Sequence, residues 1–294
     1  MELCIILFLI CLFMIAFEVI RELCCFQVTH YTAGSPKLAG LCRSRKIVFL
    51  SDLHNYRYGK KNKALYTAIE KEQPDLILIG GDMLIRSDGY TYEHTAEFLS
   101  GLPGICPVYY ANGNHEQKLK ERPGKYKQSY RDYKARLLKA GICFLENESE
   151  IFEWEGARIR VTGLEIPIHG YDYAPKGKIK KEDLEERIGD AGKAYEILLA
   201  HHPGHMKVYR EWGADLILSG HYHGGVIRIP GVGGVIAPDF TLFPRYSGGC
   251  YQVDGACAVV SRGLGVHSVP ARLFNSAEVV VVELNGNQKY SLEK

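Results

Sequence analysis

The chain has 294 residues, of which 46% are hydrophobic and 24% are charged, and its formal net charge is +2. These numbers exclude an intrinsically disordered chain and indicate one large globular domain with a full core. Because the charge is nearly balanced, no global basic field favours a nucleic acid partner, and we expect none.

The first expected element is an apolar helix at the N-terminus. The 18 residues from Leu3 to Ile20 include one charged side chain, Glu18, and would span about 27 Å as a helix. This length nearly matches the hydrocarbon core of a bilayer, so we expect residues 1–22 to form a single-pass membrane anchor. A signal peptide is the alternative, although no basic segment precedes the apolar run and no small-residue cleavage site follows it. Residues 23–45 read as a linker.

Two features bear on the location of the large domain. Lys and Arg flank the apolar helix only on its C-terminal side, which predicts a domain on the cytoplasmic face of the cell membrane. The nine cysteines include no CxxC pair, which indicates mostly free, buried thiols in a reducing compartment. The missing pair also argues against a thiolate metal site.

Beyond the linker, strand patterns alternate with helical ones. Apolar and β-branched runs predict strands over 46–50, 76–79, 108–111, 158–162, 197–200 and 216–218. Helical periodicity predicts helices over 63–71, 92–99 and 125–140, and the C-terminal part reads as hairpins around 226–229, 256–260 and 278–283. We therefore expect residues 46–294 to form an α/β fold, with two mixed β-sheets packed as a sandwich between outer helices.

Five polar motifs stand where predicted strands end. They are Asp52-Leu53-His54, Gly81-Asp82, Gly113-Asn114-His115-Glu116, His201-His202 and Gly220-His221-Tyr222-His223. Because α/β proteins place ligands at the carboxyl ends of strands, we expect these motifs to meet at one edge. An extended backbone would point Asp52 and His54 the same way, since they lie two residues apart. Carboxylate, amide and imidazole donors without thiolates indicate two divalent metals that handle phosphate oxygens.

These motifs, in this order, resemble those of the calcineurin-like metallophosphoesterase superfamily over residues 46–275. The apolar helix, Val28–Tyr31 and Ser261–Gly265 resemble the bacterial membrane-associated branch similar to the YkuE and YaeI phosphoesterases. The resemblance implies a four-layer α/β/β/α sandwich with a dinuclear metal centre. One ion would be held by Asp52, His54 and His223, the other by Asn114, His201 and His221, with Asp82 as the bridge.

The resemblance also implies a chemistry. A hydroxide shared by the two ions would attack phosphorus and hydrolyse a phosphate ester or pyrophosphate. His115 would act as the catalytic residue that steadies the transition-state charge or protonates the leaving oxygen. Manganese is the expected ion, with iron, zinc or other divalent ions as alternatives.

Substrate identity stays open at this stage. We expect a phosphorylated small molecule or lipid, and the branch resembles hydrolases of UDP-2,3-diacylglucosamine; a nuclease and a non-catalytic scaffold are the alternatives. Asn55 and Arg57 line either the substrate cleft or a plain loop, and Arg262 meets either substrate or a structural ion-pair partner. Residues 165–192 form either a lid beside the metals or a solvated insertion.

The remaining polar residues near these motifs have structural interpretations. Glu116 is expected to cap or orient its loop. His202 and His205 are expected to be neighbours of the site or surface residues. His30, His94 and His169 read as ordinary surface or hydrogen-bonding histidines.

Overall fold

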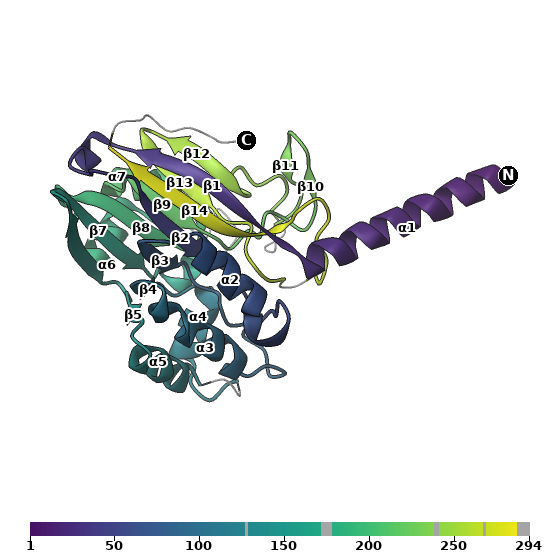
Figure 1. Ribbon diagram of the computed structural model, residues 1–294, viewed down its shortest axis with the longest axis horizontal. Coiled ribbons are helices and arrows are strands. Elements are labelled where there is room, and N and C mark those ends of the chain that lie inside the picture. The colour runs from purple at the N-terminus through teal and green to yellow at the C-terminus, as the bar shows by residue number, and fades with distance from the viewer. Residues whose placement is uncertain (127–128, 172–177, 238–240, 267–268, 287–294) are drawn as a thin grey trace.

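The computed structural model describes residues 1–126, 129–171, 178–237, 241–266 and 269–286. Two six-stranded sheets face each other, with strand orders β1-β14-β2-β3-β4-β5 and β12-β13-β9-β8-β7-β6. Helices cover the outer face of each sheet, and one long helix, α1, projects away from this body (Figure 1). The predicted four-layer α/β/β/α arrangement is confirmed.

The first sheet carries three of the five polar motifs. Its strands are β1 (Phe26–Gly34), β2 (Arg45–Leu50), β3 (Leu76–Ile79), β4 (Val108–Tyr110), β5 (Cys143–Phe144) and β14 (Ala277–Asn285). Strands β2 to β5 run parallel, whereas β14 runs antiparallel to β2. The helices that follow these strands are α2 (Lys63–Lys71), α3 (Glu93–Ser100), α4 (Asn114–Glu121) and α5 (Tyr130–Lys139).

The second sheet carries the two histidine-rich motifs. Its strands are β6 (Ser149–Trp154), β7 (Ala157–Leu164), β8 (Tyr195–Ala200), β9 (Leu216–Ser219), β12 (Gly249–Val253) and β13 (Ala256–Val260). Its helices are α6 (Lys181–Ile188) and α7 (Met206–Trp212), and a short pair, β10 (Arg228–Ile229) and β11 (Gly233–Gly234), stands apart. Strands β7, β8, β9 and β13 run parallel, so the carboxyl ends of β8 and β9 share one edge.

The continuous apolar runs are explained by burial on both faces. In β2, Val48 and Leu50 pack toward the outer helices, while Ile47 and Phe49 pack between the sheets. All four side chains are fully buried. A strand that is covered on both faces needs apolar residues at every position, which removes the alternation seen in half-exposed strands.

The prediction of a linker over 23–45 is wrong for residues 26–34. They form β1, which pairs in parallel with β14 from Phe26 against Ala277 to Gly34 against Asn285. The partner strand lies at the other end of the chain, so no local signal announces the pairing. Thr29 and His30 also break the apolar pattern of a central strand, because β1 is an edge strand and is only partly buried.

Other expectations differ from the structure in detail. The helix expected over 125–140 is described only as α5, which begins after Ser129, whose hydroxyl caps the backbone N–H of Asp132. All nine cysteines are free, as expected, but only Cys257 is buried and six are exposed. The thiols therefore contribute little to the core.

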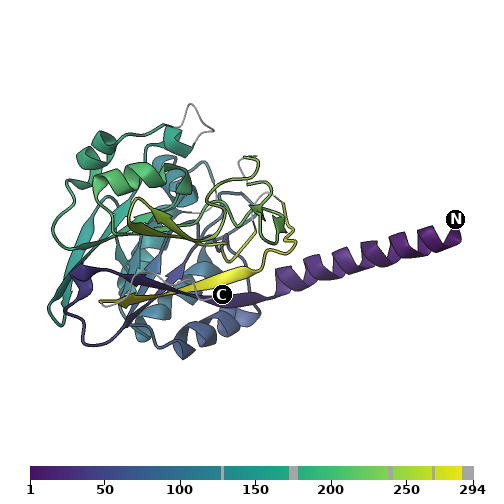
Figure 2. The same ribbon diagram turned by 90° about the horizontal axis from the view of Figure 1, so that it is seen from above.

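Helix α1 (Glu2–Cys24) is long and apolar enough to cross a membrane, a test that a signal sequence also passes. Its apolar span has no buried residue, and it projects away from the body at the end that carries β10 and β11 (Figure 2). The foot of the helix is hydrogen-bonded to the domain. There, the Tyr56 hydroxyl donates to Leu23 O at 2.6 Å and the Ser276 hydroxyl lies 3.0 Å from Glu22 Oε1.

Asp75 ties the start of β3 to β2. Its carboxylate accepts hydrogen bonds from Arg45 at 2.8 Å, from the Lys46 backbone N–H at 2.9 Å and from Arg43. Although burial works in the opposite direction, the hydrogen bonds from Arg43 and Lys46 lower the pKa of Asp75.

We predict that Asp75→Asn lowers the free energy of unfolding by about 1–3 kcal/mol at neutral pH, because charge-assisted hydrogen bonds are lost. Since the folded-state pKa is depressed, this contribution is complete above the unfolded pKa near 4 and disappears as the pH falls through the folded value. Urea denaturation at several pH values measures the difference. A deficit that is the same at acidic and neutral pH would contradict the assignment, and Asp88→Asn, at an exposed position, is the control.

Candidate metal centre

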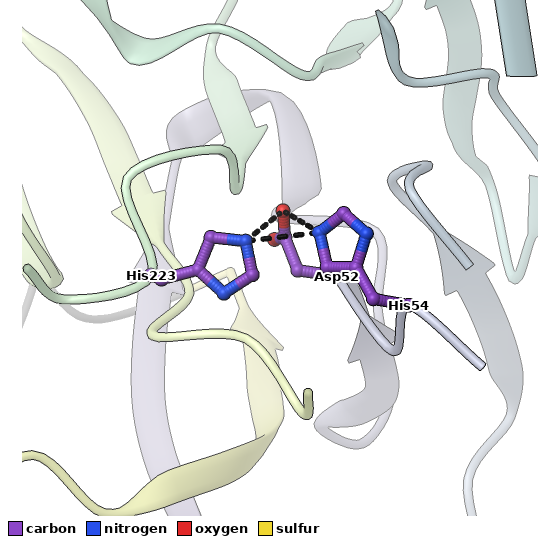
Figure 3. A group of neighbouring side chains, drawn as sticks. All are labelled: Asp52, His54 and His223. Carbon is purple, nitrogen blue, oxygen red and sulfur yellow. Dashed lines mark hydrogen bonds and ion pairs between the residues drawn. The ribbon is translucent and has the colours of Figure 1, made fainter. Parts of the chain in front are cut away.

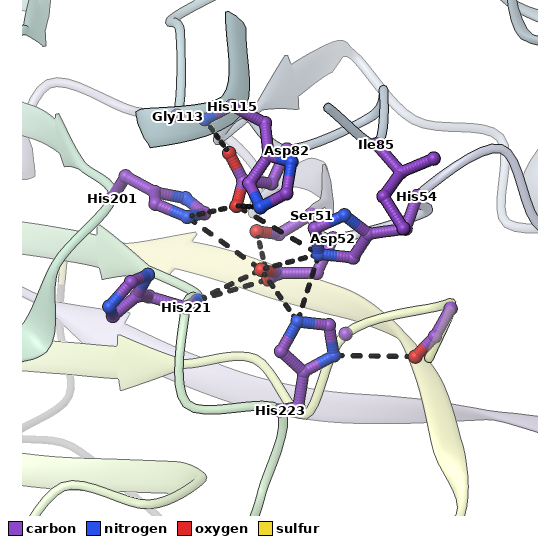
Figure 4. Close-up of polar contacts among 12 residues, drawn as sticks. Ser51, Asp52, His54, Asp82, Ile85, Gly113, His115, His201, His221 and His223 are labelled. Carbon is purple, nitrogen blue, oxygen red and sulfur yellow. Dashed lines mark hydrogen bonds and ion pairs between the residues drawn. The ribbon is translucent and has the colours of Figure 1, made fainter. Parts of the chain in front are cut away.

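The structure brings all five polar motifs together at the carboxyl edges of the two sheets (Figure 4). Asp52 follows β2, Asp82 follows β3 and the Asn114 loop follows β4. From the second sheet, His201 follows β8, and His221 and His223 follow β9. All of these side chains except the half-buried His221 are buried, so the two sheets enclose one polar cluster.

One group consists of Asp52, His54 and His223 (Figure 3). Asp52 Oδ1 lies 3.3 Å from His223 Nε2 and 3.9 Å from His54 Nε2, and the two ring nitrogens are 3.0 Å apart. His223 Nδ1 lies 3.3 Å from Gly265 O, a contact that keeps a proton on Nδ1 and leaves the Nε2 lone pair facing the group. These three donor atoms could hold a metal ion.

A second group consists of Asp82, His201 and His221. His201 Nδ1 donates to Gly80 O at 2.7 Å, so its Nε2 lone pair faces Asp82 Oδ2 at 3.1 Å. Asp82 also belongs to a further group, with His54 and His115. The groups overlap in Asp82 and His54 and therefore form one continuous cluster rather than separate sites.

Among the residues that the structure describes, two buried atoms in the cluster that could bind a metal make no hydrogen bond. They are His201 Nε2 and Asn114 Oδ1. A buried polar atom without a partner costs about 1–3 kcal/mol, so these atoms fit a bound cation that would satisfy them. The donor set, with two carboxylates, an amide oxygen and several imidazoles, suits divalent transition metals.

The electrostatics of the cluster favour a positive charge between the two carboxylates. Burial, together with the Asp82 carboxylate, raises the pKa of Asp52 to about 6, against the opposing effect of His201. Burial works against protonation of His201, but Asp82 and Asp52 raise its pKa to about 10. The two carboxylates thus attract a positive charge at this position, which a metal cation would supply.

The backbone conformation of the ligand loops differs from the expected one. Asp52, His54, Asp82, His221 and His223 all have positive φ angles, between 47° and 70°. The expected extended conformation is therefore wrong, although the side chains do converge. Non-glycine residues in this region cost of order 1–3 kcal/mol each and persist where surrounding structure enforces them, which is typical of functional sites.

Two glycines allow the backbone to approach the carboxylates. A Cβ atom at Gly113 would lie 2.2 Å from Asp82 Oδ1, and one at Gly220 would lie 2.1 Å from Asp52 Oδ2. Both distances are shorter than any real contact. The motifs therefore need glycine at these positions because the loops carrying one set of donors press against the other.

Glu116 joins two loops, the one after β3 and the one after β4, as expected for a residue that orients its loop. Its carboxylate accepts backbone hydrogen bonds from Asp82 at 2.7 Å, Leu84 at 2.8 Å and Gly113 at 3.1 Å. Burial and the nearby Asp82 raise the pKa of Glu116 to about 7. Glu116 thus positions the Asp82 loop from behind.

His115 faces the cluster with a defined ring orientation. The backbone N–H of Arg86 donates to His115 Nδ1 at 2.7 Å, so a neutral ring carries its proton on Nε2. That nitrogen lies 4.0 Å from Asp82 Oδ2. The arrangement leaves an N–H group directed toward the cluster.

The three residues expected to bind substrate lie in different surroundings. The Asn55 amide is engaged by the Thr91 carbonyl at 2.9 Å and by the Ile85 N–H at 2.7 Å, which fits the plain-loop alternative. Arg57 is exposed. Arg262 pairs with the buried Glu278 at 2.6 Å, the contact that the ion-pair alternative describes.

Residues 165–192 are packed in their described part. Tyr171 is buried, and its ring lies 5.5 Å from that of His221 and 5.6 Å from that of His202. Within the described residues, its buried hydroxyl has no hydrogen-bond partner. Gly170 O contacts His205 Nε2 at 2.8 Å, so this end of the segment lies against the histidine cluster and is not a solvated insertion. Residues 172–177 lie outside the described part.

Two residues without a sequence motif, Arg272 and Asn275, support His223. The Asn275 side chain donates to His223 O at 2.8 Å, and the Arg272 guanidinium donates to Gly265 O at 2.6 Å and Arg262 O at 2.9 Å. Both side chains are buried. No strand or motif marks their positions in the sequence, because they act on backbone carbonyls across loops.

We predict that Gly220→Ala lowers bound metal by about 10-fold or more, because the new methyl group displaces Asp52 and a change in support around a ligand has that order of effect. Elemental analysis of the purified variant measures it. Gly89→Ala, at a position where a Cβ atom meets nothing within 4 Å, is the matched control. Wild-type metal content in Gly220→Ala would show that Asp52 does not bind the ion.

The chain is similar to known proteins. The family model for calcineurin-like phosphoesterases matches residues 45–225. Metallophosphoesterase YkuE of Bacillus subtilis is 28% identical, over 88% of this chain and 85% of its own length. Phosphodiesterase YaeI of Escherichia coli is 30% identical, over 81% of this chain and 82% of its own length. The phosphopantetheinyl hydrolase structure from Mycobacterium tuberculosis aligns with a TM-score of 0.48 at 14% identity, over 78% of this chain and 95% of the other.

Proposed function

Because the chain belongs to the calcineurin-like phosphoesterase family, we propose that it is a membrane-anchored phosphohydrolase with a dinuclear metal centre. The observation that carries the proposal is the cluster of overlapping donor groups around two buried carboxylates. In a non-catalytic scaffold there would be no reason to bury two potential metal-binding atoms, His201 Nε2 and Asn114 Oδ1, beside those carboxylates without a hydrogen bond from the described residues.

We assign the donors to two ions that share Asp82. Asp52, His54 and His223 would hold the first ion, and Asn114, His201 and His221 the second. Support comes from Asp82 Oδ2, which lies 3.8 Å from His54 Nε2 and 3.1 Å from His201 Nε2, on either side of the carboxylate. Nitrogen and oxygen donors suit manganese, iron and zinc alike, and we propose manganese first.

When bound, such a pair of ions supplies an activated nucleophile from water and neutralises the phosphate oxygens. The protein's own residues orient the rest. Ser51 donates to Asp52 Oδ2 at 2.5 Å and the His221 N–H donates to Asp52 Oδ1 at 3.0 Å. The backbone N–H of His115 donates to Asp82 Oδ1 at 2.8 Å, which fixes the second carboxylate. Preorganised donors of this kind need no rearrangement during the reaction.

His115 would act on the substrate through Nε2–H. Because Nδ1 accepts from the Arg86 backbone N–H, the neutral ring keeps its one proton on Nε2, which can donate a hydrogen bond to a phosphate oxygen or to the leaving oxygen. The relative YaeI is named a phosphodiesterase, so we propose a phosphodiester as the first substrate class to test.

We further propose that α1 is retained as an anchor with the domain on the cytoplasmic face. Glu22 at the helix foot is buried and contacts Ser276, and the Leu23 carbonyl accepts from Tyr56. The foot is thus integrated into the domain, which a cleaved signal sequence would not require. The basic residues that follow α1 favour the cytoplasmic side.

We predict that Asp82→Ala abolishes manganese-dependent hydrolysis of bis-p-nitrophenyl phosphate and releases bound metal, because the shared carboxylate is lost. Asp88→Ala, at an exposed position on the same connection, should retain both properties. Turnover by Asp82→Ala equal to that of the wild type would end the proposal of a dinuclear site.

We predict that His115→Gln keeps its metal but loses turnover by about 10²–10³-fold, the usual effect of removing one hydrogen-bond donor to the transition state. Comparing p-nitrophenyl phenyl phosphate with methyl phenyl phosphate shows which oxygen this donor meets. A larger loss with the poorer leaving group indicates a hydrogen bond to the leaving oxygen, whereas an equal loss indicates one to a phosphate oxygen. His94→Gln, on the exposed surface, is the control, and undiminished turnover in His115→Gln would remove His115 from the mechanism.

A further inference from the structure

Exposed apolar side chains gather on the loops around β10 and β11. Apart from Met1 and α1, the described part of the chain has ten exposed large hydrophobic residues. Seven of them lie between 227 and 274: Ile227, Ile229, Val232, Leu242, Phe243, Val269 and Phe274. Soluble proteins rarely expose such a concentration of apolar side chains unless something covers it. We call these seven residues the apolar loop surface.

The apolar loop surface is continuous with the exposed face of α1. Phe274 and the α1 residues Phe13, Met14 and Phe17 line one pocket of about 410 Å³. Both ribbon views show the loops of β10 and β11 beside the base of α1 (Figures 1 and 2). Any bilayer that covers the apolar residues of α1 down to Phe17 therefore also reaches Phe274.

The charge of these loops suits a membrane interface. The loop sequences 226–247 and 269–275 contain three arginines, Arg228, Arg245 and Arg272, and one acidic residue, Asp239. Arg245 is exposed, and with the half-buried Arg228 it lines a pocket of about 330 Å³ that Phe274 also borders. Arginines beside exposed aromatic and aliphatic side chains can meet lipid phosphates while the apolar tips enter the acyl region.

We propose that the apolar loop surface docks on a phospholipid bilayer, beside α1, and holds the catalytic domain against the membrane. This inference rests on the membrane anchoring proposed above. Burial of apolar area in lipid favours docking, and each interfacial arginine adds attraction to anionic headgroups.

Docking would place the metal centre close to the lipid. The Leu273 N–H donates to Val226 O at 3.2 Å and the Arg228 N–H donates to Leu273 O at 3.0 Å, so the two loops form one unit. Arg228 also donates to Gly224 O at 3.1 Å, and Asn275 holds His223 O. The surface is thus hydrogen-bonded directly to the loop that carries His221 and His223, which suits a substrate with a lipid tail.

Tryptophan quenching by brominated lipid tests the docking. Full-length Val232→Trp, Phe274→Trp and Ile151→Trp are reconstituted in bilayers of phosphatidylcholine and phosphatidylglycerol brominated on the upper acyl chain. We expect about half of the added emission to be lost for Val232→Trp and Phe274→Trp, as for side chains at the headgroup and acyl boundary. Ile151→Trp, at an exposed position on β6, is the control. Its fraction of quenched emission should equal that of the wild-type protein, whose emission comes from Trp154 and Trp212.

Washing the same bilayers with alkaline carbonate separates the two proposals. Protein that is removed by the wash lacks an anchor, and the docking, which needs α1 in the bilayer, is overturned with it. Protein that stays, with quenching at 232 and 274 no greater than at 151, overturns the docking alone. Blue-shifted but unquenched emission would assign the surface to a second copy of the chain and would also overturn it.

Discussion

Two buried carboxylates that need a positive charge between them determine the rest of this structure. Asp52 and Asp82 both lie within 3.7 Å of His201 Nε2, in a cluster that the two sheets bury. Two such charges cannot be buried without compensation, because desolvation costs several kcal/mol per ion. Histidine nitrogens, backbone N–H groups and a bound cation are the available compensations, and the loops are arranged to supply them.

The sandwich makes this arrangement possible. Parallel strands β2, β3 and β4 end at the same edge of one sheet, and β8 and β9 end at the corresponding edge of the other. Backbone hydrogen bonds join neighbouring loops within each sheet, from the Asp52 N–H to Gly81 O in the first and from the Gly220 N–H to His201 O in the second, both at 3.0 Å. Between the two sheets, the His221 N–H donates to Asp52 Oδ1 at 3.0 Å. The positive φ angles of the ligand residues are held by these contacts, so the fold stabilises conformations that the loops alone would avoid.

The sequence predicted the central strands and the donor residues well, for a physical reason. Strands such as 46–50 and 76–79 are buried on both faces, and their apolar runs stand out against the polar motifs that follow. Edge strand β1 was not predicted, because its partner β14 is remote in sequence and its residues are a mixture of polar and apolar types. Arg272 and Asn275 were not predicted, because they bind backbone carbonyls, and such contacts require no particular partner residue in the sequence. The left-handed backbone at Asp52 and His54 also had no signal, since neither residue is a glycine.

The position of the metals tests the account most directly. Crystals grown with manganese and measured at the manganese absorption edge should give two anomalous peaks about 3.5–4 Å apart. We expect one beside Asp52 and His223, the other beside Asn114 and His201, with Asp82 between them. A map with no peak in the cluster, or with manganese bound only elsewhere on the protein, would contradict the account.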